Sequence, residues 1–198
     1  MKTLKDMDLM GLALSPGSAA GFNPEPKRTW ELFTDREGLG MDALDADISH
    51  LDLHGKEIAD KLRAWAANPI RTLYLWGPPG SGKTYAGICL LKYLYPGWIR
   101  YLEASRITEL GKKEGSGYLR ELYGECKVLL IDDLGVDIPR DWEQKYTFDL
   151  IETRCQKKRL PTIITSNISK SDLSKIVTER VTSRLIGDEI QFKAKDLR

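Results

Sequence analysis

The sequence predicts an α/β protein in which a parallel sheet is covered by helices on both faces. Short apolar segments that suit strands alternate with longer amphipathic segments that suit helices along most of the 198 residues. The strand-like segments are apolar throughout, which is typical of strands buried on both faces of a sheet. A glycine-rich segment also separates the first of these strands from the helix that follows it.

The N-terminal quarter of the chain is expected to be partly irregular. Residues 1–29 contain several proline and glycine residues, which favour a flexible arm. Residues 30–53 have a mixed pattern, with a short helix expected near 41–48. Over 55–67, apolar side chains recur at intervals of three and four residues. This spacing predicts an amphipathic helix, and the Asn-Pro pair after it ends that helix.

The remainder of the chain alternates regularly between strands and helices. Five apolar segments are expected to be strands: Thr72–Trp76, 98–102, 128–131, 162–165 and 190–192. Four segments between or after them are expected to be helices: 83–95, 105–123, 141–158 and 172–185. Glycine is expected to break the second of these helices, at Gly111, Gly115 and Gly117. Helical connections between successive strands make those strands parallel.

Residues 77–84 read Gly-Pro-Pro-Gly-Ser-Gly-Lys-Thr, the pattern of a phosphate-binding loop. Glycines let backbone N–H groups turn toward phosphate oxygens in conformations that a side chain would block. Lys83 is expected to reach the β- and γ-phosphates of ATP, and the Thr84 hydroxyl to bind Mg²⁺. The helix that begins here points its positive end at the phosphates. The expected nucleotide-binding residues are Gly77, Pro78, Pro79, Gly80, Ser81, Gly82, Lys83, Thr84 and Tyr85.

Two carboxylates follow the apolar strand at 128–131. Side chains at the carboxyl end of a parallel strand face the ligand crevice of such a sheet. Asp132 is therefore expected to hold Mg²⁺, directly or through water. Asp133 is placed to orient and polarise the water that attacks the γ-phosphate.

The composition excludes some classes of protein. A net charge of +1 rules out attraction of the whole molecule to nucleic acid, although local patches stay open. No apolar run approaches the ~18 residues of a membrane span. The apolar patch at 9–14 is too short for a secretory signal, and two aspartates lie where the core of a signal would begin. A local helix or docking segment is the better interpretation of this patch.

The cysteines are far apart, and they are expected to be buried thiols in a reducing compartment, which places the protein in the cytoplasm. Together with His50 and His54 they give no zinc-binding spacing. The three are Cys89, Cys126 and Cys155.

Four segments together resemble one family. They are the phosphate loop, Leu-Leu-Ile-Asp-Asp-Leu-Gly at 129–135, Pro-Thr-Ile-Ile-Thr-Ser-Asn at 161–167 and Glu-Arg-Val-Thr-Ser-Arg-Leu at 179–185. In this order they resemble AAA+ ATPases of the DnaC type, which are bacterial and phage helicase loaders, with the IstB transposition helpers as cousins. The resemblance covers residues 55–198, which we take as the ATPase domain. Residues 1–54 are then an N-terminal arm that docks a partner.

The resemblance implies roles for three further residues. Asn167 matches the polar sensor that contacts the γ-phosphate or the attacking water. Arg184 matches the arginine finger, which completes the ATP site of a neighbouring subunit. A guanidinium suits this role because its planar donors stabilise charge spread over phosphoryl oxygens. Arg180 lies four residues earlier on the same helical face and is the second candidate for the finger.

The sequence also departs from the family pattern. Most AAA+ proteins carry glutamate where this chain has Asp133, so slow hydrolysis is expected. The chain ends 14 residues after Arg184, which leaves no room for a helical lid domain. No cysteine precedes Cys89, so a zinc-bearing helicase-binding module is not expected. The final Asp-Leu-Arg resembles the ending of many DnaC-type chains, but no role follows for Arg198.

A surface for DNA is expected on the glycine-containing segment 105–123. Its basic residues lie near Tyr118 and Arg120, a mixture that tracks phosphates and stacks a base. In the family, an inserted helix in this region is associated with single-stranded DNA. A second basic run, at 157–159, fits a solvated surface better. The expected DNA-binding residues are Arg106, Lys112 and Lys113.

Three functions are consistent with the sequence. The leading hypothesis is an ATP-dependent helicase loader that assembles on single-stranded DNA, with ATP bound between its own subunits and a replicative helicase as partner. The alternative is an IstB-like transposition helper that binds duplex DNA and recruits a transposase. A nucleotide-gated scaffold without catalysis is the third. The preferred form of DNA separates the first two, and measurable ATP turnover separates both from the third.

Overall fold

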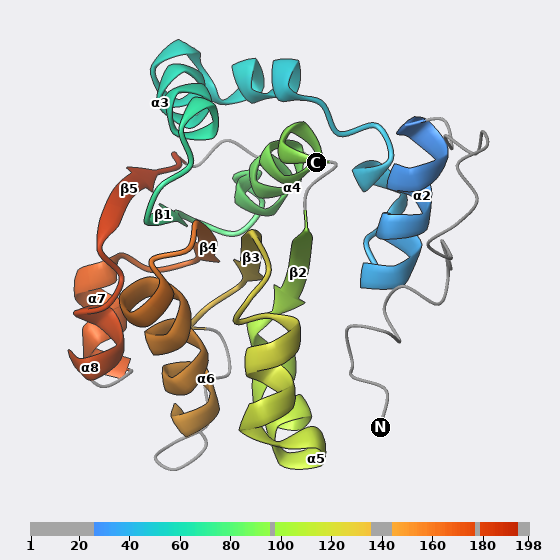
Figure 1. Cartoon of the computed structure of the whole chain (residues 1–198). Helices are drawn as coiled ribbons and strands as arrows, with labels where there is room; N and C mark the ends of the chain where they lie inside the picture. Colours follow the sequence, from blue (N-terminus) through green and yellow to red (C-terminus); the bar gives the residue numbers. More distant parts are fainter. Residues whose placement is uncertain (1–25, 96–97, 136–143, 177–178, 194–198) are drawn as a thin grey trace, which may run out of the picture.

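The computed structural model describes residues 26–95, 98–135, 144–176 and 179–193. Its centre is a five-stranded sheet in the order β2-β3-β4-β1-β5, in which every pair of neighbouring strands is parallel (Figure 1). The predicted α/β class is therefore confirmed. The strands are β1 (Thr72–Trp76), β2 (Ile99–Glu103), β3 (Val128–Asp132), β4 (Thr162–Ser166) and β5 (Gly187–Gln191).

Helices cover both faces of the sheet. One face packs against α2 (Pro26–Glu37), two short 3-10 helices η1 (Met41–Ala43) and η2 (Ile48–His54), α3 (Lys56–Ala67) and α4 (Lys83–Leu94). The other face packs against α5 (Ala104–Leu122), α6 (Gln144–Ile151), α7 (Lys170–Ile176) and α8 (Glu179–Thr182). Successive residues of a strand point to opposite faces, so Leu73 and Leu75 join the first core and Tyr74 joins the second.

The N-terminal segment is more regular than the sequence indicated. Residues 26–37 form α2, where a flexible arm and a mixed segment were expected. Pro26 indicated a turn, but proline also suits the first turn of a helix, where its missing N–H removes no hydrogen bond. Trp30 and Phe33 of this helix are buried and stack with ring centroids 4.9 Å apart. Trp30, Phe33 and Leu51 belong to the first core, so described residues on both sides of the predicted boundary at residue 54 pack in one core.

Glycine breaks α5 at one position, whereas the sequence predicted breaks at three. Gly115 has non-helical dihedral angles, with φ at 85°, and divides the helix. Gly111 is helical and buried, and a side chain there would overlap the ring of Tyr146 in α6. Gly117 has open space around it. The prediction that all three glycines break the helix was therefore wrong, because Gly111 serves the close packing of α5 on α6.

Within the helix expected over 172–185, the structure describes α7 and α8, and residues 177–178 between them lie outside the described part of the chain. The first starts earlier than predicted because Ser169 caps it: the Ser169 hydroxyl accepts a hydrogen bond from Asp172 N and donates one to the Asp172 carboxylate. The second ends at Thr182, so Arg184 lies beyond the helix and not on it. The last strand also begins three residues earlier than expected, at Gly187.

The helix expected over 141–158 is observed from Gln144, and residues 141–143 lie outside the described part of the chain. It continues beyond α6 as a π-helical segment, Glu152–Lys158. Among the described residues, no helix combines the length and the apolar character that crossing a membrane requires.

Candidate nucleotide-binding site

The phosphate loop connects β1 to α4 at the carboxyl end of the sheet. Gly80 and Gly82 both have left-handed backbone conformations, with φ at 76° and 83°. Residues with a Cβ rarely adopt this conformation, which explains the glycines of the motif. Gly82 caps the N-terminus of α4, so the helix begins at Lys83, at the point where its unpaired N–H groups favour an anion.

The Lys83 side chain is folded onto the loop. Its ammonium donates hydrogen bonds to the carbonyl oxygens of Gly77 and Pro78, both at 2.9 Å, and to Asn167 Oδ1 at 3.1 Å. Burial lowers the pKa of Lys83, and the nearby carboxylates Asp133 and Asp132 oppose that shift. Lys83 and Asn167, predicted to contact the same phosphates, therefore lie within hydrogen-bonding distance of each other.

Three hydroxyl groups converge on the Asp132 carboxylate at the end of β3. Thr84 Oγ1 donates to Asp132 Oδ1 at 2.8 Å, and Thr165 Oγ1 donates to the same oxygen at 2.5 Å. Tyr101 donates to the other oxygen, Asp132 Oδ2, at 3.0 Å. The predicted pair of magnesium ligands, Thr84 and Asp132, is thus in direct contact. A hydroxyl and a carboxylate oxygen side by side are the hard ligands that Mg²⁺ takes in nucleotide sites, so this pair fits the ion.

Asp133 has a left-handed backbone conformation, with φ at 56°. Its N–H donates a hydrogen bond to Thr165 Oγ1 at 2.9 Å, which fixes the strand end. The side chain reaches the same cleft as Lys83 and Asn167. Burial and the charge of Asp132 raise the pKa of Asp133, whereas Lys83 lowers it. A carboxylate with a raised pKa beside the lysine suits the predicted contact with the attacking water.

A cleft of about 1130 Å³ opens beside the loop. One wall consists of the phosphate loop, Tyr85, Ile88, Asp133 and Asn167, and the opposite wall consists of residues between 40 and 54. This volume slightly exceeds the roughly 300–1,000 Å³ of typical ligand pockets, so the cleft has room for a nucleotide. The N-terminal segment, predicted to dock a partner, therefore also forms half of this cleft.

Two histidines on the N-terminal wall were not predicted as site residues. His50 Nδ1 lies 2.7 Å from the Tyr85 hydroxyl, and the two rings stack with centroids 6.0 Å apart. His54 contacts the ring of Phe192 edge-on, at 4.8 Å between centroids. The signal in the sequence was a pair of histidines four residues apart, which we considered for zinc alone. Among the described residues, no group of His, Cys, Asp and Glu could hold a metal ion by itself.

Thr165 and Tyr101 were also missed. Thr165 lies within the strand that precedes Asn167. It was counted as part of an apolar strand, so its hydroxyl was not considered for the site. Tyr101 lies in the edge strand β2, two residues before Glu103. Tyrosine is grouped with the apolar residues in a strand pattern, so its hydroxyl was not considered. The contact of both with Asp132 depends on the strand order, which places β2 and β4 on either side of β3.

Arg184, the first candidate for the arginine finger, lies away from this cleft. Arg184 extends over the ring of Phe148 at 5.1 Å, and its Nη2 lies 3.9 Å from Glu152 Oε1. It precedes β5, and the register of β5 with β1 puts it at the end of the sheet opposite to the phosphate loop. The side chain of Arg180 and all of Arg198 lie outside what the structure describes.

The predicted DNA-binding residues Arg106, Lys112 and Lys113 are exposed on α5, and none lines the cleft. Lys113 Nζ lies 3.6 Å from the Glu114 carboxylate. The second basic run is largely neutralised, because Lys157 is 3.5 Å from Glu152 and Lys158 is 2.9 Å from Glu125.

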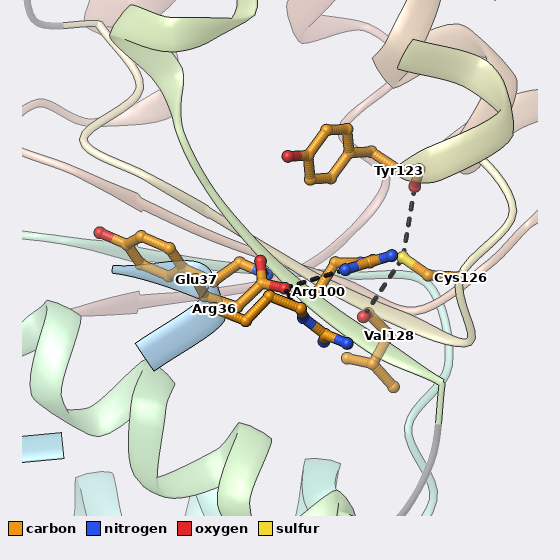
Figure 2. Close-up of polar contacts among 7 residues, drawn as sticks. Arg36, Glu37, Arg100, Tyr123, Cys126 and Val128 are labelled. Carbon is orange, nitrogen blue, oxygen red and sulfur yellow. Dashed lines mark hydrogen bonds and ion pairs between the residues drawn. The ribbon is translucent and has the colours of Figure 1, made fainter. Parts of the chain in front are cut away.

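The cysteines are free thiols, of which Cys89 and Cys126 are buried and Cys155 is half-buried. Burial raises the pKa of Cys89 to about 11. Cys126 donates weak hydrogen bonds to the carbonyl oxygens of Tyr123 and Val128 (Figure 2). These contacts are structural and lie apart from the cleft.

Comparison with solved structures places this geometry in a known fold. No family model and no curated protein matches the chain by sequence. A structure of DnaI matches with a TM-score of 0.67 and 21% identity, over 81% of this chain and 94% of that one. A structure of the DnaC helicase loader matches with a TM-score of 0.64 and 22% identity, over 79% and 100%. The replication initiator DnaA, bound to AMPPCP and single-stranded DNA, matches with a TM-score of 0.65 and 17% identity, over 76% and 50%.

The strand order, the phosphate loop and these matches define the fold: the chain has the α/β P-loop fold of its AAA+ structural neighbours. Its structural neighbours include the DnaC helicase loader and DnaI. Proteins of the DnaC type are also the ones that the sequence resembles.

Proposed function

We propose that the chain binds ATP in this cleft and hydrolyses it, as a DnaC-like helicase loader in DNA replication. The observation that carries the proposal is the convergence of Lys83, Thr84, Asp132 and Asn167 at one end of the sheet. These residues come from the phosphate loop and from the ends of β3 and β4, and they meet only because the fold brings them together.

In hydrolysis, a water molecule attacks the γ-phosphorus, the bond to the β-phosphate oxygen breaks, and ADP and phosphate leave. Lys83 exchanges its carbonyl partners for oxygens of the β- and γ-phosphates. Asn167 holds the γ-phosphate or the water, and Asp133 accepts a hydrogen bond from that water. A magnesium ion held by Thr84 and Asp132 would neutralise charge on the phosphates. The short carboxylate of Asp133 is consistent with slow turnover.

The helicase-loader role rests on the resemblance of the four segments and on the neighbours of the fold. DnaC is described as a helicase loader, and the DnaA neighbour was solved with single-stranded DNA. By analogy we assign single-stranded DNA to the exposed basic residues of α5, and a replicative helicase to the N-terminal arm. Arg184 would complete the ATP site of a neighbouring copy, which makes the active form an oligomer.

The proposal is tested with the purified full chain and the replicative helicase of its native host. Size-exclusion chromatography with light scattering should detect a complex of the two proteins that depends on ATP and that Lys83→Ala disrupts. Fluorescence anisotropy should show tighter binding to single-stranded than to duplex oligonucleotides at the same salt concentration. Preference for duplex DNA without a helicase complex would favour the transposition helper. ATP binding without turnover would favour the scaffold.

A further inference from the structure

Glu37, the last residue of α2, ties this helix to the edge strand β2. Its Oε1 accepts hydrogen bonds from Arg100 Nη1 at 3.0 Å and from Arg36 Nε at 2.9 Å (Figure 2). Its Oε2 accepts a hydrogen bond from the backbone N–H of Tyr101 at 3.2 Å. The side chains of Glu37 and Arg100 are both about 5% exposed. A buried ion pair of this kind fixes geometry, because neither charge is stable without the other.

The contact with Tyr101 N occupies the open side of the sheet. β2 is the first strand in the order, so the N–H groups on its outer side have no neighbouring strand among the described residues. The Glu37 carboxylate takes the place of a strand at one residue, and α2 packs beside β2. The position of Tyr101 therefore depends on α2, which belongs to the N-terminal segment.

The side chain of the same residue reaches the metal-ligand carboxylate. The Tyr101 hydroxyl lies 3.0 Å from Asp132 Oδ2, and the ring is 8% exposed in the first core. A carboxylate oxygen only accepts hydrogen bonds, so the Tyr101 hydroxyl is the donor in this contact. Thr84 and Thr165 hold the opposite oxygen, so Tyr101 prevents rotation of the carboxylate about its last bond.

We propose that Tyr101 is a positioning residue for Asp132, and that Glu37 couples α2 to it. Tyr101 contacts the proposed metal ligand and does not itself contact metal or nucleotide. The inference rests on the proposed ATP site. It adds that displacement of α2, for example when a partner binds the N-terminal segment, loosens Asp132 and weakens metal binding. The path has two contacts, from the Glu37 carboxylate to Tyr101 N and from the Tyr101 hydroxyl to Asp132.

Tyr101→Phe tests the first contact, because it removes the hydroxyl and keeps the ring. The probe is Mn²⁺, whose free concentration is read by electron paramagnetic resonance in the presence of the non-hydrolysable analogue AMPPCP. Loss of a residue that orients a metal ligand weakens metal affinity by about 10–100-fold. We expect a weakening near the lower end, about tenfold, because Thr165 still holds Asp132.

Tyr74→Phe is the matched control. Tyr74 is also a buried strand tyrosine, but its hydroxyl donates to the carbonyl oxygen of Ile168 at 2.9 Å and does not touch Asp132. This variant should keep wild-type Mn²⁺ affinity. Tyr101→Phe with wild-type Mn²⁺ affinity overturns the inference, as does an equal loss in both variants.

Glu37→Gln tests the second contact, because it keeps the size of the side chain and removes its charge. We expect Mn²⁺ affinity to fall about threefold, a smaller loss than in Tyr101→Phe, since the amide oxygen still accepts one bond. A thermal melt confirms folding, and unchanged Mn²⁺ affinity in the folded variant overturns the coupling to α2. Binding of a fluorescent ATP analogue in EDTA distinguishes failure of this inference from failure of the proposed ATP site. If the wild-type chain binds no nucleotide, the ATP site itself is wrong; if it binds, the metal comparison decides.

Discussion

Lys83 Nζ donates a hydrogen bond to Asn167 Oδ1 at 3.1 Å, across 84 positions of sequence. The two residues follow β1 and β4, which are neighbours in the sheet and paired in register from Thr72 with Thr162 onward. Both were predicted to contact phosphate, one from a motif shared by many proteins and the other from a narrower resemblance. Their contact is the reason to treat the two predictions as one site.

Lys83→Ala should weaken ATP binding by roughly tenfold or more. The ammonium is the fixed positive charge at the loop, and hydrogen bonds to charged groups contribute about 1.5–3 kcal/mol each. Isothermal titration with ATP and Mg²⁺ measures the change. Lys92→Ala is a suitable control, because Lys92 lies on the same helix but bonds to Leu44 O. Equal affinity in wild type and Lys83→Ala would remove the phosphate-loop assignment.

Changing Lys112 and Lys113 together to Ala should weaken binding to single-stranded DNA. Each phosphate contact that is lost should lower the slope of log affinity against log salt by about 0.7. Anisotropy titrations at several salt concentrations give the slope. Lys157 and Lys158, both paired with glutamates, provide the control double variant, which should keep the wild-type slope. The reverse pattern would move the DNA surface to the second basic run.

Gly111→Ala should destabilise the protein, because the added Cβ overlaps the ring of Tyr146. Overpacking of a well-packed contact costs about 1–3 kcal/mol. Gly117→Ala, in the same helix with open space around it, should be neutral or stabilising by up to about 1 kcal/mol. Urea unfolding of the two variants compares these values directly. Equal stability would mean that α5 and α6 are not in close contact at Gly111.

His54 should make the protein less stable in mild acid. Burial lowers its pKa below the usual 6.5, so the unfolded chain binds a proton more readily than the folded one. The contribution of neutral His54 to the free energy of unfolding is fully present above pH 6.5. It is lost as the pH falls through the lowered pKa of His54 in the folded protein. His54→Gln should therefore show a smaller loss of unfolding free energy between pH 7 and pH 5 than wild type. Parallel pH profiles of the two proteins would exclude His54 as the cause.

The strands and the phosphate loop could be predicted from the sequence because their signals are local. β1 was predicted to the residue, and Thr84 and Asp132 lie in direct contact. The contributions of Tyr101 and Thr165 could not be predicted, because their contacts with Asp132 require the order of the strands. The local sequence around a hydroxyl in an apolar strand does not indicate which side chain of a neighbouring strand it will contact.

The N-terminal wall of the cleft was missed for a related reason. This wall contains two short 3-10 helices, η1 and η2, whose short turns give no extended periodicity. Their burial depends in part on α4, which lies later in the sequence and packs against both 3-10 helices. The helix expected over 172–185 was predicted to extend too far, because the last helical residue that the structure describes there is Thr182.

Arg184 is predicted to act on the ATP site of a neighbouring copy. Within its own chain it lies at the end of the sheet opposite to the phosphate loop, beside Phe148 and Glu152. Arg184→Ala should therefore leave ATP affinity of the monomer nearly intact while it removes hydrolysis and ATP-driven assembly. Glu152→Ala is the control: it removes the acidic neighbour of Arg184 and keeps the guanidinium, so it should retain hydrolysis.

A mixture of two inactive variants gives the sharper test of Arg184. Lys83→Ala lacks a working loop and Arg184→Ala lacks the finger, but one mixed interface pairs the intact loop of one copy with the intact arginine of the other. Phosphate release should therefore return in the mixture and reach a maximum near equal concentrations of the two. If both variants are folded and associate, but the mixture stays inactive, the finger does not act between copies through Arg184. Arg180 then becomes the residue to change, because it is the other arginine of the 179–185 segment.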